Sequence, residues 1–452
     1  MAGAVRSRLP RGIDQTRRND GILYINTVRI VDILAKLEIL ADAAKYDASC
    51  ASSGGGGRAA VKSKEIGSTE RMGICHSYAP DGRCISLLKI LLTNFCTYEC
   101  SYCINRNSSN VRRARFTVDE VVDLTLNFYR RNYIEGLFLS SGVVRSPDYT
   151  MGQLVEVARK LREDHGFRGY IHLKTIPDAD GELLAAAGMH ADRLSINVEL
   201  PTREGLALLA PEKDYKTIRL SMGRIRARLD EAREAKRELG RVDNLRPART
   251  VQPPFAPAGQ STQMIIGADP ATDAQILATS ANLYASYRLK RVYYSALSPI
   301  PDPSSILPPR PPPLLREHRL YQSDWLMRFY GYRHDEITAG STNDGMLALD
   351  VDPKLGWALR NRGAFPVDLN RADWEQVLRV PGLGVKTARK VLQMRRWQKI
   401  RLEDLVALRA DVKKAMPFII CANHHPDLAE PEARQLLARH APAARQLALD
   451  LA

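Results

Sequence analysis

The chain has 452 residues, with 66 Lys and Arg against 51 Asp and Glu, and a formal net charge of +15. Its length predicts two or three domains, and its 44% hydrophobic residues exclude a wholly disordered chain. Seven cysteines are too few for a disulfide framework, and the positive charge favours a polyanionic partner or an anionic cofactor.

The first 70 residues predict one helix and a flexible segment. Apolar residues recur at helical spacing from Val28 to Tyr46, and the glycine-rich run at 52–57 predicts a flexible break. Residues 1–11 lack the apolar core of a signal peptide, and no segment approaches the roughly 20 apolar residues of a membrane span. We therefore expect a cytoplasmic protein with no membrane contact.

Between residues 86 and 300 strands alternate with helices, a pattern typical of a parallel α/β sheet. The predicted strands are Ser86–Leu92, Gly136–Leu139, Gly169–Lys174, Arg193–Val198, Gln263–Ile266 and Arg291–Ser295. The predicted helices are Val118–Asn132, Met151–Asp164, Asp180–Ala187, Lys216–Leu239 and Asp273–Tyr287. We expect a core domain over residues 71–300, with its chemistry at the C-terminal ends of the strands.

Cys96, Cys100 and Cys103 follow the first of these strands in a C-x3-C-x2-C spacing. Three thiolates suit a [4Fe-4S] cluster whose fourth iron is open to a small ligand. The alternative is zinc, but a structural zinc site needs four closed ligands and a catalytic one needs histidine or carboxylate partners. The number of ligands and their spacing favour the cluster.

The same triplet, with Tyr102 before its last cysteine, resembles the signature of radical S-adenosylmethionine (SAM) enzymes. Residues 73–96 are similar to one subgroup, described only by DNA modification or repair, and the resemblance covers about residues 70–425. It implies a partial (β/α)6 TIM-like barrel that binds the cluster and SAM. Reduction of the cluster, by a donor such as flavodoxin or ferredoxin, would cleave SAM to a 5′-deoxyadenosyl radical.

Two segments match the positions at which the family binds SAM. Ser140, Ser141 and Gly142 lie where the family has a Gly-Gly-Glu-like turn, here without the glutamate, and an ordinary turn is the alternative. Lys174 closes a strand from which it can reach the SAM carboxylate, although lysines at strand ends are often only solvated. The segment that begins at Gln263 lies where the family supports the adenine.

Strict alternation places Ser195, Asn197 and Glu199 on one face of a predicted strand. Burying these side chains without partners would cost about 1–3 kcal/mol each, so a bound ribose or methionine group is one explanation for them. By resemblance, Asn197 and Glu199 are assigned to SAM. The alternative is a polar strand whose side chains bond to neighbouring loops.

Other residues of the core are harder to assign. Cys75 and Cys84 precede the triplet and either form a second metal site or are packed in the core, as free cysteines often are. Tyr293 and Tyr294, in the last predicted strand, are expected to face the substrate. The sequence identifies no catalytic residue.

Residues 301–362 predict a linker. Prolines between Ser298 and Pro313 exclude helix and central strand, and a helix is expected at His318–Phe329.

Residues 363–425 resemble a helix-hairpin-helix DNA-binding motif, with helices at Ala372–Arg379 and from Val385 joined by the turn Pro381–Gly384. Such a hairpin presents backbone N–H groups to a phosphate, although it can also serve only as a protein contact. A second unit at 401–420 lacks the hairpin glycines. Trp374, Trp397 and Phe418 are expected in the core of this small all-α module. The candidate nucleic-acid-binding residues are Gly382, Gly384, Lys386, Thr387, Arg389 and Lys390.

Seven basic residues and no acidic one lie between Lys386 and Arg401, which favours a phosphate backbone as partner. A helical tail is expected at 426–452. The sequence thus predicts a radical SAM enzyme that modifies or repairs a nucleic acid, and double-stranded DNA is favoured as the substrate. The target base would have to leave the base stack to reach the barrel. The alternatives are an enzyme that modifies tRNA or ribosomal RNA and a non-catalytic nucleic-acid-binding protein with a structural metal.

Overall fold

The structure is a computed structural model that describes residues 32–44, 73–78, 84–242, 254–300, 302–340 and 344–426. The basic start of the chain, the glycine-rich break at 52–57 and most of the expected tail lie outside the described residues. The first expected helix is described over residues 32–44, where it buries Leu37, Leu40 and Ala44.

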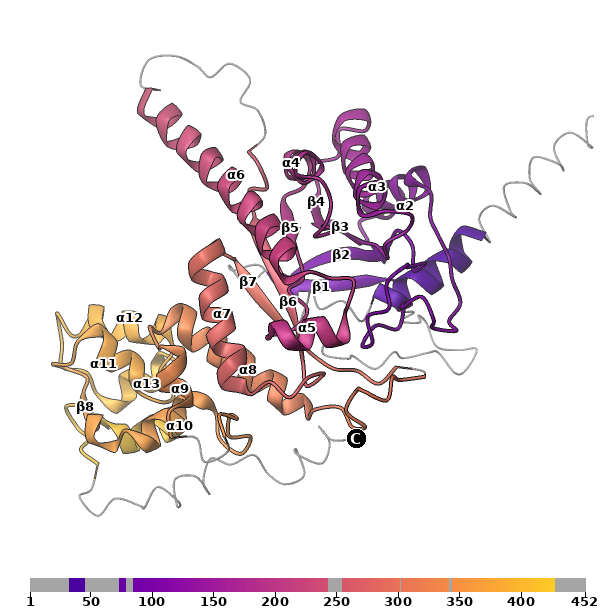
Figure 1. The fold of residues 1–452 in the computed structure, drawn as a ribbon. Helices are drawn as coiled ribbons and strands as arrows, with labels where there is room; N and C mark the ends of the chain where they lie inside the picture. Colours follow the sequence, from indigo (N-terminus) through magenta and orange to yellow (C-terminus); the bar gives the residue numbers. More distant parts are fainter. Residues whose placement is uncertain are drawn as a thin grey trace, which may run out of the picture.

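Seven strands of the described chain form one curved sheet, in the order β1 to β7 (Figure 1). Strands β2 to β7 pair in parallel, and β1 pairs with β2 antiparallel. The parallel α/β half-barrel is therefore confirmed, with β1 as an additional edge strand. The strands are β1 Ile74–Tyr78, β2 Cys84–Leu91, β3 Gly136–Ser140, β4 Tyr170–Lys174, β5 Arg193–Ser195, β6 Gly259–Ile266 and β7 Arg291–Ala296.

Helices follow the strands as crossover connections. They are α2 Val118–Arg130, α3 Pro147–Arg159 with a π-helical turn at Lys160–Asp164, α4 Gly181–His190, α5 Arg203–Leu209, α6 Tyr215–Val242 and α7 Asp273–Tyr287. Helices α2 and α7 begin with capping boxes, in which Thr117 pairs with Glu120 and Thr272 with Gln275. The short α5 was not predicted.

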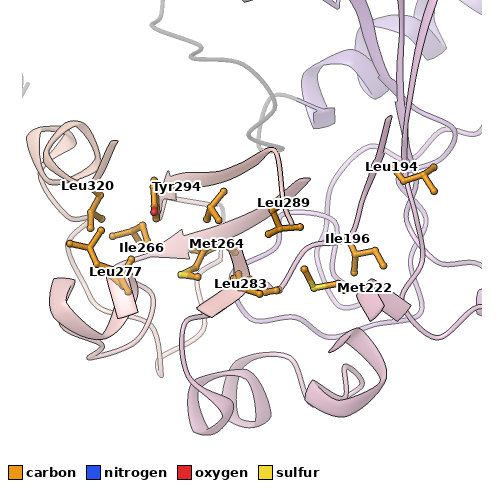
Figure 2. Packing of buried hydrophobic residues seen from close by; sticks show 14 of the residues in the cluster. Leu194, Ile196, Met222, Met264, Ile266, Leu277, Leu283, Leu289, Tyr294 and Leu320 are labelled. Carbon is orange, nitrogen blue, oxygen red and sulfur yellow. The ribbon is translucent and has the colours of Figure 1, made fainter. Parts of the chain in front are cut away.

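The two faces of the sheet differ. The outer face is apolar, with Leu88, Leu139 and Leu173 fully buried. Under β5 to β7, Leu194 and Met264 pack against helix residues such as Met222 and Leu283 (Figure 2). The inner face instead carries polar side chains, and it leads to the cleft described below.

The expectation that both tyrosines of β7 face the substrate was wrong for Tyr294, and it stays a prediction for Tyr293. Tyr294 lies on the outer face, fully buried, and its hydroxyl bonds to Ser280 at 2.9 Å and to Asp324 at 3.3 Å (Figure 2). Tyr293 points to the inner face but is 6% exposed and does not line the cleft. Neighbours in a strand point to opposite faces, so the two side chains cannot share a surface.

The C-terminal part is mostly helical. Its elements are α8 Leu314–Phe329, α9 His334–Thr338, α10 Pro353–Arg360, a 3-10 turn Arg362–Ala364, β8 Val367–Asp368, α11 Trp374–Arg379, α12 Val385–Met394, α13 Leu402–Ala407, α14 Val412–Ala415, a 3-10 turn Met416–Phe418 and β9 Ile419–Ile420. Strands β8 and β9 pair in parallel and join the two ends of this module. Phe418 is fully buried, whereas Trp397 is 90% exposed, so the prediction that Trp397 fills the core was wrong.

Candidate active site

A cleft open to solvent, with an empty volume of about 1170 Å³, lies at the C-terminal ends of the parallel strands. Two of the predicted site residues do not line it. Ser140 and Ser195 are buried below it. Ser195 forms a hydrogen bond with His172 at 3.0 Å, which agrees with the alternative that the polar side chains of this strand bond to neighbouring protein groups. The predicted residues that the cleft brings together are Cys96, Cys100, Cys103, Ser141, Gly142, Lys174, Asn197 and Glu199.

Backbone N–H groups approach two of the three cysteine sulfurs. The N–H of Val143 donates to Cys96 Sγ at 3.4 Å, and the N–H of Asn105 donates to Cys103 Sγ at 3.4 Å. Hydrogen bonds of this kind stabilise thiolates and tune the reduction potential of an iron–sulfur cluster. The local backbone is therefore suited to charged sulfur ligands.

Arg113 braces the segment that carries the cysteines. Its guanidinium donates to the carbonyl oxygens of Asn94, Asn105 at 2.9 Å, Arg106 at 2.6 Å and Ser109 at 2.9 Å. These carbonyls flank the triplet on both sides. Arg113 therefore fixes the shape of the loop, a role that the sequence analysis missed.

Gly142 is needed for a close backbone contact. A Cβ atom at this position would lie 2.2 Å from the carbonyl oxygen of Phe95 and 3.2 Å from Cys96 Cβ. Real Cβ atoms do not approach backbone oxygens so closely, and both neighbours are held by hydrogen bonds, from Phe95 N to Thr93 Oγ1 at 3.1 Å and from Val143 N to Cys96 Sγ at 3.4 Å. The glycine thus lets the turn after β3 pack directly against the first cysteine.

Two of the three thiols, those of Cys100 and Cys103, lie in surroundings that disfavour the thiolate unless a cation is nearby. Burial raises the pKa of Cys100 to about 12 and that of Cys103 to about 11, and the positive charge of Lys213 only partly opposes this. Thiolates are the anchors of iron–sulfur clusters, and bound iron supplies the missing positive charge. The donor set therefore fits a cluster held by three cysteines.

Zinc is the alternative metal for these side chains. Among the described residues, no three His, Cys, Asp or Glu side chains converge closely enough to hold a single metal ion. A cluster instead distributes its thiolates over different irons. Cys75 lies half-buried on β1, and the side chain of Cys84 is outside the described residues, so a second metal site stays a prediction.

Glu199 meets a lysine that sequence reasoning missed. Its backbone is left-handed (φ +64°), and its carboxylate contacts Lys213 Nζ at 2.5 Å, with both side chains buried. Although burial lowers the pKa of Lys213, the charges of Glu199 and Cys100 raise it above its usual value. Lys213 is therefore charged, and both residues line the cleft beside the cysteines.

Asn197 is held by a contact across the sheet. Its amide donates to Gln263 Oε1 at 3.4 Å, and both side chains line the cleft. Lys174 lines it from β4. The cleft thus offers amides, a hydroxyl, a carboxylate and a cation to a zwitterionic ligand next to the cysteines.

The nucleic-acid candidates lie on and around α12. Gly382 has a positive φ (+82°), and a Cβ there would lie 2.4 Å from Asp411 O, so packing against the second unit requires this glycine. Gly384 precedes α12 as its N-cap, and Thr387 is half-buried. Arg395 donates hydrogen bonds to the carbonyls of Leu369 and Ala372, so its role is to stabilise the module.

The remaining cations are all exposed and lie on either side of the exposed Trp397 in the sequence, and we call them the basic face. None of them has a carboxylate within ion-pair distance among the described residues. The basic face consists of Lys386, Arg389, Lys390, Arg396, Lys399 and Arg401.

No helix in the described ranges is long and apolar enough to cross a membrane.

Comparisons with known proteins identify the core. Residues 90–239 match the family model of the Radical SAM superfamily, and no curated protein matches the chain. Among solved structures, a crystal structure of HydG, a maturase of FeFe-hydrogenase, shares 14% identity over 52% of this chain and 48% of that chain, with a TM-score of 0.36. The FeFe-hydrogenase maturase HydG from Carboxydothermus hydrogenoformans shares 15% identity over 52% and 50%, with a TM-score of 0.38.

The chain therefore spans about half the length of these solved structures. Members of the matched superfamily bind a [4Fe-4S] cluster and SAM. Residues 90–239, which contain the three cysteines, form a Radical SAM superfamily domain.

Proposed function

We propose that this protein is a radical SAM enzyme that modifies or repairs nucleic acid, and that its partner is double-stranded DNA. The observation that carries the proposal is the basic face, whose six exposed cations have no carboxylate within ion-pair distance among the described residues. A phosphate backbone supplies the matching charge without a sequence requirement. The hairpin between α11 and α12, which resembles a helix-hairpin-helix motif, supports the same partner.

Within the barrel, we assign the cluster to Cys96, Cys100 and Cys103. SAM is assigned to the cleft beside them, with Ser141, Gly142, Lys174, Asn197 and Glu199 as its contacts. When bound and reduced, the cluster and SAM supply a 5′-deoxyadenosyl radical that abstracts hydrogen. The residues of the chain hold the loop, orient the ligand through amide and carboxylate contacts, and exclude water.

Enzymes of this superfamily need an external reductant, and flavodoxin or ferredoxin is our candidate. A target base inside a duplex cannot reach a radical formed in the barrel, so it has to leave the stack.

The partner is tested by binding of the full chain to duplex DNA at increasing salt. If all six cations contact phosphates, affinity falls by about 10³-fold or more between roughly 50 and 200 mM salt. Lys386→Glu should weaken binding and flatten the salt dependence. Lys236→Glu, an equally exposed lysine on α6, is the matched control and should bind normally.

Normal duplex binding by Lys386→Glu would contradict the assignment of the basic face. Binding to transfer or ribosomal RNA in place of DNA would favour an RNA-modifying enzyme. Anaerobic reconstitution tests the cluster. Stoichiometric zinc with no iron–sulfur absorbance would contradict the cluster and favour a protein with a structural metal. Finally, 5′-deoxyadenosine and a mass change in nucleosides released from the incubated nucleic acid would identify the reaction.

A further inference from the structure

The surface beside Cys96 lies outside the cleft. Phe95 and Thr97 flank this cysteine in the chain, both are exposed, and neither lines the cleft. Phe95 is 47% exposed, whereas Cys100 is 5% exposed. At Cys96 the cysteine loop therefore reaches a surface that is separate from the cleft.

Two segments lie against the cysteine loop at this surface. On one side, Thr93 pairs with Arg115 in an antiparallel bridge. On the other side, the N–H of Thr97 donates to the carbonyl oxygen of Val143 at 2.9 Å. Arg145 follows Val143 by two residues, a span of no more than about 7 Å. Backbone contacts thus hold a segment that carries arginine on each side of the loop.

Tyr149 brings two of these arginines together. Arg115 donates to Tyr149 Oη at 2.8 Å, and the guanidinium of Arg145 lies 4.6 Å from the centre of the same ring. Arg112 is a third, exposed arginine, and its carbonyl oxygen accepts a hydrogen bond from Asn94 Nδ2 at 2.8 Å. None of the three arginines has a carboxylate within ion-pair distance in the described ranges. The arginine face, as we call this surface, consists of Phe95, Thr97, Arg112, Arg115, Arg145 and Tyr149.

Next to Cys100 the same loop is acidic instead. The N–H of Glu99 donates to Glu212 Oε1 at 3.0 Å, and the N–H of Ser108 donates to Glu99 Oε1 at 2.8 Å. Neither glutamate forms an ion pair with a described residue. An acidic partner that approaches the loop is therefore attracted at the arginine face and repelled near Cys100.

We propose that the arginine face is the docking surface for an acidic electron-transfer protein, and that electrons enter the cluster past Cys96. Electron transfer slows steeply with distance, so the donor has to bind where the cysteine triplet lies next to an accessible surface. Complementary charge speeds such encounters, and the exposed ring of Phe95 supplies an apolar contact. Redox encounters bury on the order of 1,200 Å² or less, so a small face is sufficient.

This inference rests on the proposed function, in which a protein such as flavodoxin reduces the cluster, and it adds the surface on which that protein docks. In each encounter the reduced flavin is oxidised by one electron, and the cluster is reduced by that electron. Duplex DNA is the other polyanion that arginines bind. The position beside Cys96 and the exposed Phe95 favour the redox protein, because a phosphate backbone offers the phenyl ring no apolar contact.

The test is calorimetric titration of the full chain, reconstituted with its cluster, with oxidised flavodoxin at low salt. The wild type should bind, and its affinity should fall as salt screens the exposed charges. Arg145→Glu replaces attraction by repulsion and Phe95→Ala removes the apolar contact, so each should weaken binding by about fivefold to tenfold. Rapid-freeze electron paramagnetic resonance then measures how fast reduced flavodoxin reduces the cluster, and this rate should fall in the same two variants.

The controls separate a lost docking surface from a damaged cluster site. Arg131→Glu changes an exposed arginine after α2, at the opposite end of the strands, and should bind flavodoxin as the wild type does. Iron content and the extent of reduction by dithionite should be the same in all variants, because a small reductant needs no docking surface. Less reduction by dithionite in Arg145→Glu and Phe95→Ala would overturn the docking role.

Wild-type affinity for flavodoxin in both Arg145→Glu and Phe95→Ala would also overturn the proposal. So would a wild-type chain that binds neither flavodoxin nor ferredoxin. If Arg145→Glu loses affinity for duplex DNA and keeps its affinity for flavodoxin, the arginine face belongs to the nucleic acid and the proposal is wrong.

Two further results distinguish this proposal from the one on which it rests. Lys386→Glu should lose duplex binding but keep its affinity for flavodoxin. If the wild-type chain does not bind duplex DNA yet binds flavodoxin through Arg145, the DNA partner fails and the docking surface stands.

Discussion

In the cleft, the buried charges next to the cysteines lie in contact, with Lys213 2.5 Å from Glu199. On the basic face, six exposed cations have no carboxylate partner among the described residues. A buried charge without a partner is costly, whereas an exposed one stays hydrated at little cost. This difference is what the proposed function expects, because a preformed site for a small ligand needs compensated buried charge, whereas a surface that binds a polyanion keeps its cations exposed.

The largest expected effect is on the cleft. Cys100→Ala removes a cluster anchor, so iron binding and formation of 5′-deoxyadenosine should both be abolished. Iron analysis after anaerobic reconstitution measures this directly. Cys421→Ala changes a buried free cysteine in the C-terminal module and should retain full iron content. Full iron content in Cys100→Ala would contradict the assignment of Cys100 as a ligand of the cluster.

Variants of the Glu199–Lys213 pair test whether the buried charge of the cleft is balanced by a partner within the protein. Lys213→Met leaves a buried carboxylate without its partner and should destabilise the fold by about 3–5 kcal/mol. Lys213→Arg keeps the charge and should recover most of that loss. Thermal unfolding measures both, and Glu199→Gln combined with Lys213→Met should be more stable than Lys213→Met alone. An unchanged melting temperature in Lys213→Met would show that the pair is dispensable.

Arg113 is a cation of the cleft region whose role is structural, because its guanidinium holds the backbone of the cysteine loop. Arg113→Met removes donors to four carbonyl groups, each bond worth about 1 kcal/mol, and should loosen the cysteine loop. We expect a lower yield of reconstituted cluster and an altered electron paramagnetic resonance spectrum of its reduced state. Arg112→Met, at the exposed neighbouring position, is the matched control. Identical spectra for both variants would contradict a positioning role for Arg113.

The smallest effect concerns the basic face. Trp397 is 90% exposed, so Trp397→Ala should leave the melting temperature unchanged. If its indole stacks on an unpaired base, the variant should bind single-stranded DNA about 1–3 kcal/mol more weakly. Quenching of tryptophan fluorescence on binding provides a second readout. Trp325→Ala, on the half-exposed surface of α8, should bind as the wild type does.

Much of the barrel could be predicted from the sequence, because buried strands and crossover helices have distinct periodicities. All six predicted strands occur in the structure, and α7 has the predicted bounds Asp273–Tyr287. The edge strand β1 was missed, since its five residues show no clear alternation of apolar side chains. The strand predicted to run to Val198 ends at Ser195, because the chain then departs toward the left-handed Glu199.

The missing parts of the site depend on contacts that no local pattern records. Lys213 reaches Glu199 across the connection that contains α5, and Arg113 acts through carbonyl groups of a folded loop. Trp397 was wrongly predicted to lie in the core because large aromatic side chains are usually buried, and this general tendency was followed without knowledge of its neighbours. Residue type and spacing allowed a cysteine site to be predicted because the chemistry of thiolates is specific. Residue type predicted the exposure of Trp397 poorly because exposure depends on the neighbouring side chains.

Arg379 links the module to the rest of the molecule. Its guanidinium stacks 3.8 Å from the ring centre of Tyr332 and 4.8 Å from that of Trp357, and pairs with Glu336 at 2.9 Å. Helix α8 is in turn fixed to β7, where Tyr321 Oη bonds to Tyr294 O at 2.9 Å. Under the proposed function, these contacts fix the distance between the basic face and the cleft. The altered nucleotide would then lie a constant number of bases from the gripped phosphates, whatever the sequence between them.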